Sequence, residues 1–134
     1  MLYNRGTGWA DWELSNFWNR ISYIDDFPYN ILEALAEYLK TGEEQNVEFN
    51  AEGWFYTFRF TYNVKVGDRV VYESTVDFAS DFICEIEKNL VSWSHFPANR
   101  KSDEDYLELV DLIVEVRTEL LDDNLIDRWL EIIS

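Results

Sequence analysis

The side chains that carry most enzyme chemistry are scarce in this sequence. His95 is the only histidine and Cys84 the only cysteine. A zinc site draws several ligands from histidine, cysteine and carboxylate side chains, and a nucleophilic cysteine needs a positively charged neighbourhood that favours its thiolate. Cys84 instead lies between Ile83 and Glu85. We therefore predict a loop imidazole at His95, a buried structural thiol at Cys84, and no metal site.

Motifs that hold phosphates or calcium ions are also missing. Gly6 and Gly8 form the only close pair of glycines, and no GxGxxG or GxxxxGKS/T spacing follows a predicted strand. Asp103, Asp105 and Glu108 could bind Mg²⁺ or Ca²⁺, but their segment lacks the loop length and the central glycine of an EF-hand. The sequence therefore predicts no catalytic residues and no cofactor, and we expect a protein that is not an enzyme.

Negative charge dominates the chain. Its 134 residues include 27 acidic and 11 basic side chains, which give a formal net charge of -16. A field of this sign repels phosphate backbones and anionic lipid. We therefore expect no direct binding of nucleic acid or of a membrane surface, and we expect any electrostatic partner to be a basic protein.

Four carboxylates form what we call the acidic stripe, namely Glu104, Glu108, Asp111 and Glu115. Their spacing places them on one side of a predicted helix, with about 5–6 Å between neighbouring Cβ atoms. An ordinary solvated helix face can have this composition. A stripe of this kind would also focus a negative field toward a basic partner and raise the rate of association.

The composition is that of a globular protein. Hydrophobic residues make up 47% of the chain and aromatic residues 17%, which is enough apolar surface to offset the ordering entropy of folding. The length suits a single acidic globular domain over residues 1–134. We find no apolar run that could cross a membrane and no signal-peptide pattern, and one cysteine excludes an internal disulfide. A cytoplasmic location is the expectation.

The middle of the chain has the period-two pattern of a β-sheet. Side chains alternate from 54 to 66, which places one set on a single face, namely Trp54, Tyr56, Phe58, Phe60, Tyr62, Val64 and Val66. Phe55 falls on the opposite face. Similar patterns predict strands at about 46–50 and 69–77, so that three strands form an antiparallel meander.

The turns of this meander must keep the apolar faces together. A four-residue turn would pair Phe49 with Trp54. After Val66, a loop of three residues or a β-bulge is needed to bring the next apolar set, Val70, Tyr72 and Val76, to the aromatic side.

Amphipathic helices are predicted before and after the sheet. The first, capped by Asp11, has an apolar side of Leu14, Phe17, Trp18, Ile21 and Ile24, and the second begins near Pro28 and ends at Gly42. After the sheet, Asp77 or Ser80 caps a helix that bears Phe82, Ile83, Ile86, Leu90 and Trp93. Ser102 starts a capping box for a long helix, and a last helix covers about 125–133. The order is α-α-β-β-β-α-α-α, an α+β fold in which flanking helices cover one face of the meander.

The acidic charge and the missing site residues favour a binding function. We expect a small inhibitor of the immunity or antitoxin type, which neutralises a basic toxin such as a nuclease by electrostatic occlusion. One alternative is a DNA mimic of the anti-restriction type, whose carboxylates replace phosphates and which would compete with DNA for several unrelated basic proteins. A hydrolase with scattered carboxylates would instead need two facing acids in a pocket.

A structural subunit that forms homodimers is a further alternative. Phe55 and Trp12 are large aromatic residues without a place on a predicted core face, and exposed aromatic residues are common at interfaces. We therefore name Phe55 and Trp12, together with the acidic stripe, as predicted contacts with a partner.

Overall fold

The computed structural model describes residues 1–6, 8–14 and 16–121. In this part of the chain the elements are β1 (Leu2–Asn4), β2 (Trp9–Leu14), β3 (Phe17–Ser22), α1 (Tyr29–Thr41), β4 (Gln45–Asn50), β5 (Phe55–Phe60), β6 (Val64–Val66), β7 (Arg69–Tyr72), α2 (Thr75–Glu87), α3 (Leu90–Ser94) and α4 (Asp103–Leu120). The strands form two antiparallel sheets, β1-β2-β3 and β4-β5-β6-β7. The predicted α+β class is confirmed, whereas the predicted order and the single three-stranded meander are wrong. The helix predicted at 125–133 lies outside the described residues.

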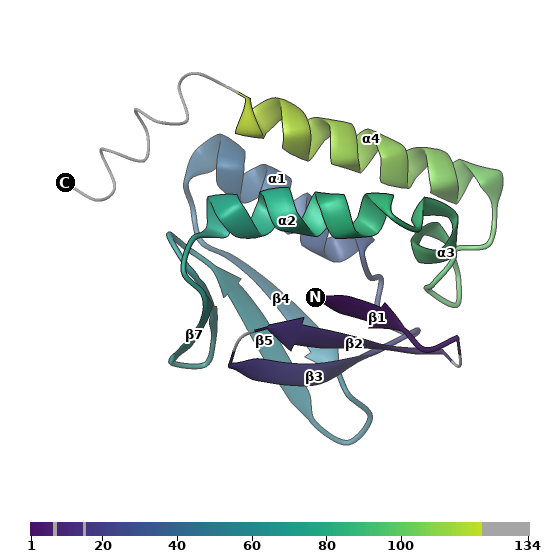
Figure 1. The fold of residues 1–134 in the computed structure, drawn as a ribbon, viewed down its shortest axis with the longest axis horizontal. Helices are drawn as coiled ribbons and strands as arrows, with labels where there is room; N and C mark the ends of the chain where they lie inside the picture. The colour runs from purple at the N-terminus through teal and green to yellow at the C-terminus, as the bar shows by residue number, and fades with distance from the viewer. Residues whose placement is uncertain (7, 15, 122–134) are drawn as a thin grey trace.

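Helices and sheets occupy opposite sides of the molecule. Figure 1 shows α1, α2 and α4 side by side, with the N-terminal sheet crossing β4 and β5 beneath them. The core lies between these parts. Its centre is the Trp12 ring of β2, which contacts Phe49 of β4, Phe58 of β5 and Phe82 of α2.

The strands β2 and β3 pair as a β-hairpin where we predicted a helix. In the register of the hairpin, Ala10 faces Ile21, Trp12 faces Asn19 and Leu14 faces Phe17. All six side chains are buried. Apolar residues at 14, 17, 18 and 21 fit helical spacing, and short apolar patterns of this kind are ambiguous between helix and strand. The strand form prevails because it inserts Trp12 between the second sheet and α2, a contact that local spacing does not encode.

The second sheet keeps the predicted faces, but its central strand is shorter than predicted. Tyr56, Phe58 and Phe60 are buried as predicted. Trp54 and Tyr62 were predicted to be buried too, yet they are 53% and 46% exposed, because β5 begins after Trp54 and ends before Tyr62. The turn pairs Phe49 with Tyr56 instead of Trp54, a shift of two residues that leaves the same side chains on the core face.

A β-bulge interrupts the pairing of β6 with β7, as the constraint on the faces predicted. Val64 pairs with Tyr72 and Lys65 with Val70, with the irregularity between them. Tyr72 therefore reaches the aromatic side, where its ring lies 5.4 Å from that of Phe78. The extra residue of the bulge turns Val71 inward, so that Val71 is buried in place of Val70.

The helix α2 begins earlier than predicted. Ser74 is its cap, because the Ser74 hydroxyl accepts a hydrogen bond from the Asp77 backbone N–H at 3.2 Å. The predicted caps Asp77 and Ser80 are therefore wrong, and Val76 belongs to α2 and not to a strand. Cys84 is exposed, contrary to the prediction, because α2 turns its other side, with Phe82, Ile83 and Ile86, toward the core.

The two helices with the strongest local signals form as predicted. The helix α1 ends at Gly42, which has a left-handed φ of 74° and whose N–H donates to the carbonyl of Tyr38. The helix α4 has a complete capping box, in which Ser102 accepts from the Asp105 N–H and the Asp105 carboxylate accepts from the Ser102 N–H.

Replacing Ser102 by alanine is expected to lower the free energy of unfolding by about 1 kcal/mol, because it removes the acceptor for an N–H of the first turn of α4. Chemical denaturation monitored by circular dichroism measures this loss. Ser80→Ala, at an exposed position inside α2, is the matched control and should stay within about 0.5 kcal/mol of the parent. Equal stability of the two variants would contradict a role for the capping box.

Candidate protein-binding site

Two of the four carboxylates of the acidic stripe form ion pairs within the chain. Glu108 forms an ion pair with Arg100, and Glu115 forms one with Lys40 of α1. In the part of the chain that the structure describes, Glu104 and Asp111 form no ion pair. Two of the four carboxylates thus hold α4 against its neighbours. Whether the stripe binds a partner stays a prediction.

The two predicted aromatic contacts have opposite positions. Trp12 is completely buried, so the prediction that it reaches a partner surface is wrong. The reason is the hairpin, which turns Trp12 into the core instead of onto a helix surface. Phe55 is 62% exposed on the outer side of β5, and its contact with a partner stays a prediction.

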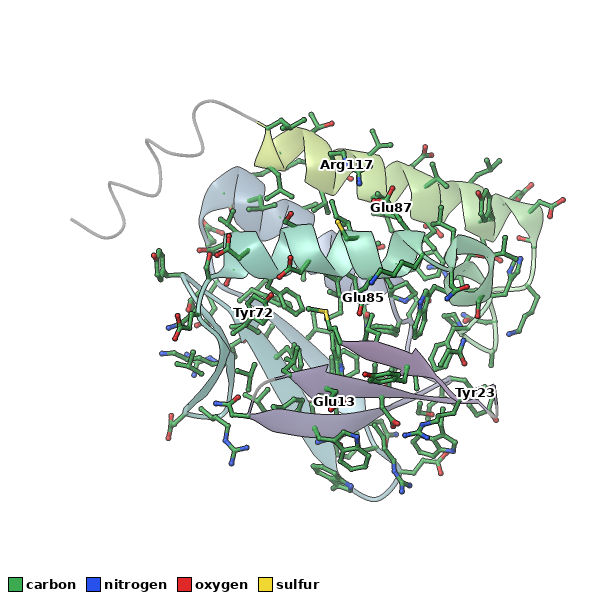
Figure 2. The ribbon with its side chains drawn as sticks, viewed as in Figure 1. Glu13, Tyr23, Tyr72, Glu85, Glu87 and Arg117 are labelled. Atoms are coloured by element: carbon green, nitrogen blue, oxygen red, sulfur yellow. The ribbon has the colours of Figure 1, made fainter. Side chains whose placement is uncertain are left out.

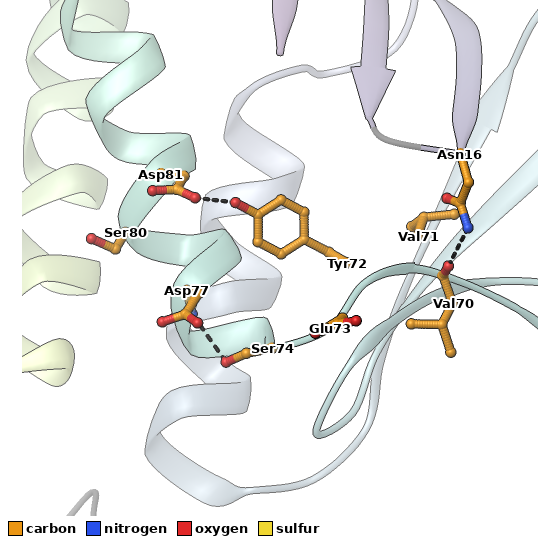
Figure 3. Close-up of a pocket in the computed structure, with 9 residues that line it drawn as sticks. All are labelled: Asn16, Val70, Val71, Tyr72, Glu73, Ser74, Asp77, Ser80 and Asp81. Carbon is orange, nitrogen blue, oxygen red and sulfur yellow. Dashed lines mark hydrogen bonds between the residues drawn. The ribbon is translucent and has the colours of Figure 1, made fainter.

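A different feature, which we call the α2 furrow, is a concave surface beside α2. Its first part is a hollow of about 580 Å³ between β7 and the start of α2 (Figure 3). The Tyr72 ring points across this hollow, and its hydroxyl donates a hydrogen bond to Asp81 of α2. At the opposite wall, Asn16 donates from Nδ2 to the carbonyl of Val70 at 2.8 Å, which ties the turn after β2 to β7.

The furrow continues along α2. A second hollow of about 410 Å³ shares Tyr72 and Asp81 with the first and adds Glu13 of β2 and Glu85 of α2. A third, of about 450 Å³, shares Glu85 and reaches α3. Figure 2 shows Glu13, Tyr72 and Glu85 on the side of the molecule where α2 faces the N-terminal sheet. Neighbouring hollows share wall residues, so they lie next to one another along α2.

Carboxylates dominate the wall of the α2 furrow. Glu13, Glu73 and Asp77 are exposed and form no ion pair among the described residues. Glu85 accepts from Lys88 at 2.7 Å and from the backbone amine of Met1 at 3.1 Å. The hydrogen bond from Lys88 is the main reason that the pKa of Glu85 lies below its usual value. Glu85 therefore stays ionised at neutral pH.

Tyr72 contributes a neutral aromatic side chain to the furrow. Burial of its hydroxyl, assisted by the hydrogen bond to Asp81 and by the negative charge there, raises the pKa of Tyr72 to about 12. The hydroxyl is protonated at neutral pH and donates to Asp81, so the furrow offers one aromatic wall and several carboxylate acceptors. Such a groove can accept ammonium or guanidinium groups.

The sequence analysis missed the residues of the furrow as candidates for a site. Asp77, Asp81 and Glu85 recur at a spacing of four, which places them on one side of a helix. This spacing could have identified them as a row of carboxylates. Glu13 and Tyr72 come from distant segments that folding brings to α2. His95 lies in the predicted loop, where its Nδ1 is 3.0 Å from the carbonyl oxygen of Arg100.

The described residues contain neither a cluster of metal ligands nor a helix that could span a membrane. Over residues 1–6, 8–14 and 16–121, no three histidine, cysteine or carboxylate side chains gather as metal ligands would. Across the same ranges, none of the helices combines the length and the apolar character that crossing a bilayer requires.

Comparisons of the chain with models of protein families, with curated proteins and with solved structures find no match. A functional assignment for this chain therefore rests on the geometry and the charge of the α2 furrow.

Proposed function

We propose that the protein is a small acidic inhibitor of the immunity or antitoxin type, which captures a basic protein by taking a cationic segment of it into the α2 furrow. The observation that carries this proposal is that two carboxylates in the first hollow of the furrow, Glu73 and Asp77, are exposed and form no ion pair among the described residues. The net charge of -16 draws a basic partner from a distance.

The dimensions of the furrow favour an extended segment. The helix α2 has 13 residues, which corresponds to about 20 Å at a rise of 1.5 Å per residue. About six residues of extended chain cover this length. Asp77, Asp81 and Glu85 are one helical turn apart, about 6 Å per step, and every second residue of a strand advances by about 6.7 Å. Basic side chains at alternate positions of an extended segment therefore reach successive carboxylates. Of these, Asp77 is unpaired among the described residues, and the other two would accept from the segment in addition to the donors that they already have.

We expect the double variant Glu73→Gln/Asp77→Asn to bind a basic peptide about fivefold to tenfold more weakly than the parent, because each exposed ion pair contributes roughly 0.2–1 kcal/mol. The probe is a fluorescein-labelled peptide of alternating lysine and serine. Fluorescence anisotropy at ionic strengths of about 0.01 M and 0.15 M, where the Debye lengths are about 30 and 8 Å, measures the affinity and its salt dependence.

The matched control is Glu104→Gln/Asp111→Asn, which changes the net charge by the same amount but lies on the acidic stripe. If the furrow holds the peptide, this control variant should weaken binding by less than about twofold, because it removes only the long-range attraction of two charges. A peptide with the same lysines in one block should bind less well than the alternating one. Equal losses in both double variants, or a preference for the block peptide, would contradict docking in the furrow. Competition with duplex DNA for several unrelated basic proteins would instead favour the DNA-mimic alternative.

A further inference from the structure

The outer side of the N-terminal sheet is aromatic and uncovered. In the register of β1, β2 and β3, Tyr3 lies opposite Asp11, and Trp18 lies opposite Glu13. Trp9 is on the same side of β2 as these acidic residues, two residues before Asp11. Tyr3 is 50% exposed and Trp18 is 55% exposed. We call Tyr3, Trp9 and Trp18 the aromatic face, which points away from the core that Trp12 enters on the other side of the sheet.

A hollow of about 550 Å³ lies in this face, walled by Arg5, Trp9, Asp11, Trp18 and Arg20. Asp11 is almost completely buried, and its Oδ2 pairs with Nη2 of Arg5 at 2.5 Å. Arg20 forms no ion pair with a carboxylate of the described residues. Its guanidinium carbon lies 5.7 Å from the centre of the Trp9 ring, a distance typical of a cation–π contact.

Open charges of both signs therefore share the aromatic face. Arg20 and Glu13 form no ion pair within the described ranges, either with each other or with another residue. They occupy diagonal positions on β3 and β2, where Cα atoms are about 7–8 Å apart. A partner that covers this face has to satisfy one cation and one anion at this separation.

We propose that the aromatic face binds a second copy of this chain, in a two-fold dimer in which Arg20 of each copy pairs with Glu13 of the other. A two-fold contact is self-complementary, so that residue i meets residue j and j meets i. A basic partner would meet the open Arg20, and an anionic partner would meet the net charge of -16. A second copy satisfies both charges, and tryptophan, tyrosine and arginine are the residues that dominate binding energy at interfaces.

The dimer is expected to be weak at low ionic strength. Tyr3 and Trp18 are about half exposed and Trp9 is less so, and together they offer roughly 250 Å² if each has about 200 Å² of surface. Stable interfaces bury about 800 Å² per partner. The charge of -16 on each copy also opposes association. Because two exposed ion pairs contribute little by comparison, rising ionic strength should strengthen the dimer. Binding of a basic partner should instead weaken as ionic strength rises. The two proposals therefore predict opposite salt dependences and can fail separately.

A charge swap between copies tests the proposal by sedimentation velocity over a concentration series at two ionic strengths. The parent chain should shift from one copy toward two as its concentration rises, and more so at high salt. Arg20→Glu and Glu13→Arg alone should each weaken association about tenfold at low salt, because each variant replaces both attractive pairs of the two-fold contact by like-charge pairs. Their equimolar mixture should restore it, because one copy then presents two carboxylates at the contact and the other presents two guanidinium groups.

Two aromatic variants locate the contact. Trp18→Ala should weaken self-association at least tenfold, whereas Phe55→Ala, which removes an equally exposed ring from the other sheet, should leave it unchanged. Circular dichroism confirms that each variant is folded. A parent chain that remains monomeric at high concentration and high salt would overturn the proposal. So would a mixture of the charge variants that fails to associate, or a dimer that depends on Phe55 and not on Trp18.

Discussion

Replacing Trp12 by alanine is expected to lower the free energy of unfolding by about 3–5 kcal/mol, the largest effect of any single substitution we consider. The indole is fully buried. It stacks on Phe58 at a ring distance of 4.8 Å and meets the edge of Phe27 at 5.3 Å. Its removal leaves a cavity where the two sheets and α2 meet, and neighbours on three separate elements cannot all move in to fill it.

Urea denaturation monitored by tryptophan fluorescence and circular dichroism measures this loss. Trp12→Phe keeps an aromatic ring in the core, so its free energy of unfolding should fall by only about 2 kcal/mol. This variant can be measured in place of Trp12→Ala if the alanine variant does not fold. Trp18→Ala is the matched control, since it removes the same side chain from the exposed side of the same hairpin and should change stability by less than about 0.5 kcal/mol. Similar losses for the two alanine variants would contradict the observed faces of the hairpin.

Replacing Arg100 by alanine is expected to cost about 2–3 kcal/mol. The Arg100 side chain is only 17% exposed. Its Nε and Nη2 donate to both carboxylate oxygens of Asp26 at 2.9 and 2.8 Å, and its Nη1 donates to Asp105 at 3.2 Å. The guanidinium carbon also lies 3.9 Å from the ring centre of Tyr29. Arg100 thus joins the start of α1 to the start of α4, and its loss leaves carboxylates without their counter-charge.

The effect of Arg100→Ala should depend on pH. Hydrogen bonds from Ser102, assisted by Arg100, hold the pKa of Asp105 below its ordinary value of 3.8. A lowered carboxylate pKa contributes stability above the unfolded pKa, and this contribution is lost as pH falls through the folded pKa. The difference between the parent and the variant should therefore be largest near neutral pH and should shrink below about pH 4. Thermal unfolding across this range measures it.

Arg59→Ala provides the matched control. Within the part of the chain that the structure describes, Arg59 forms an ion pair with Glu44 alone, and both side chains are well exposed. Exposed ion pairs contribute little to stability, so this variant should unfold close to the parent at every pH. A difference for Arg100→Ala that stayed constant down to acidic pH would show that lost packing, and not the carboxylates, dominates.

The helices α1 and α4 could be predicted because their signals act over a few residues. Gly42 supplies the left-handed residue that ends α1, and Ser102 with Asp105 supplies the capping box of α4. The bulge within β7 followed from the need to keep Tyr72 on the face of Val64. In each case the deciding atoms lie close together in the sequence or on one pair of strands.

The N-terminal hairpin could not be predicted in this way. The apolar residues from Leu14 to Ile24 fit a helix as well as two strands, and the choice depends on Trp12 meeting rings as distant in sequence as Phe82. The same applies to the acidic stripe. Its regular spacing suggested an open surface, but Glu115 is paired with Lys40, which approaches only when α1 packs against α4.

The sequence by itself determined the α+β class, the two best-capped helices, the buried side of β5 and the strongly negative charge, because these depend on composition, periodicity and local hydrogen bonds. Only the tertiary structure decided which charges remain open. It paired Glu108 and Glu115 within the molecule, gathered Glu13, Tyr72 and Asp81 along one furrow, and left Trp18 and Arg20 on an uncovered face. The physical reason is that a side chain becomes available to a partner only when packing between distant segments has left it without one.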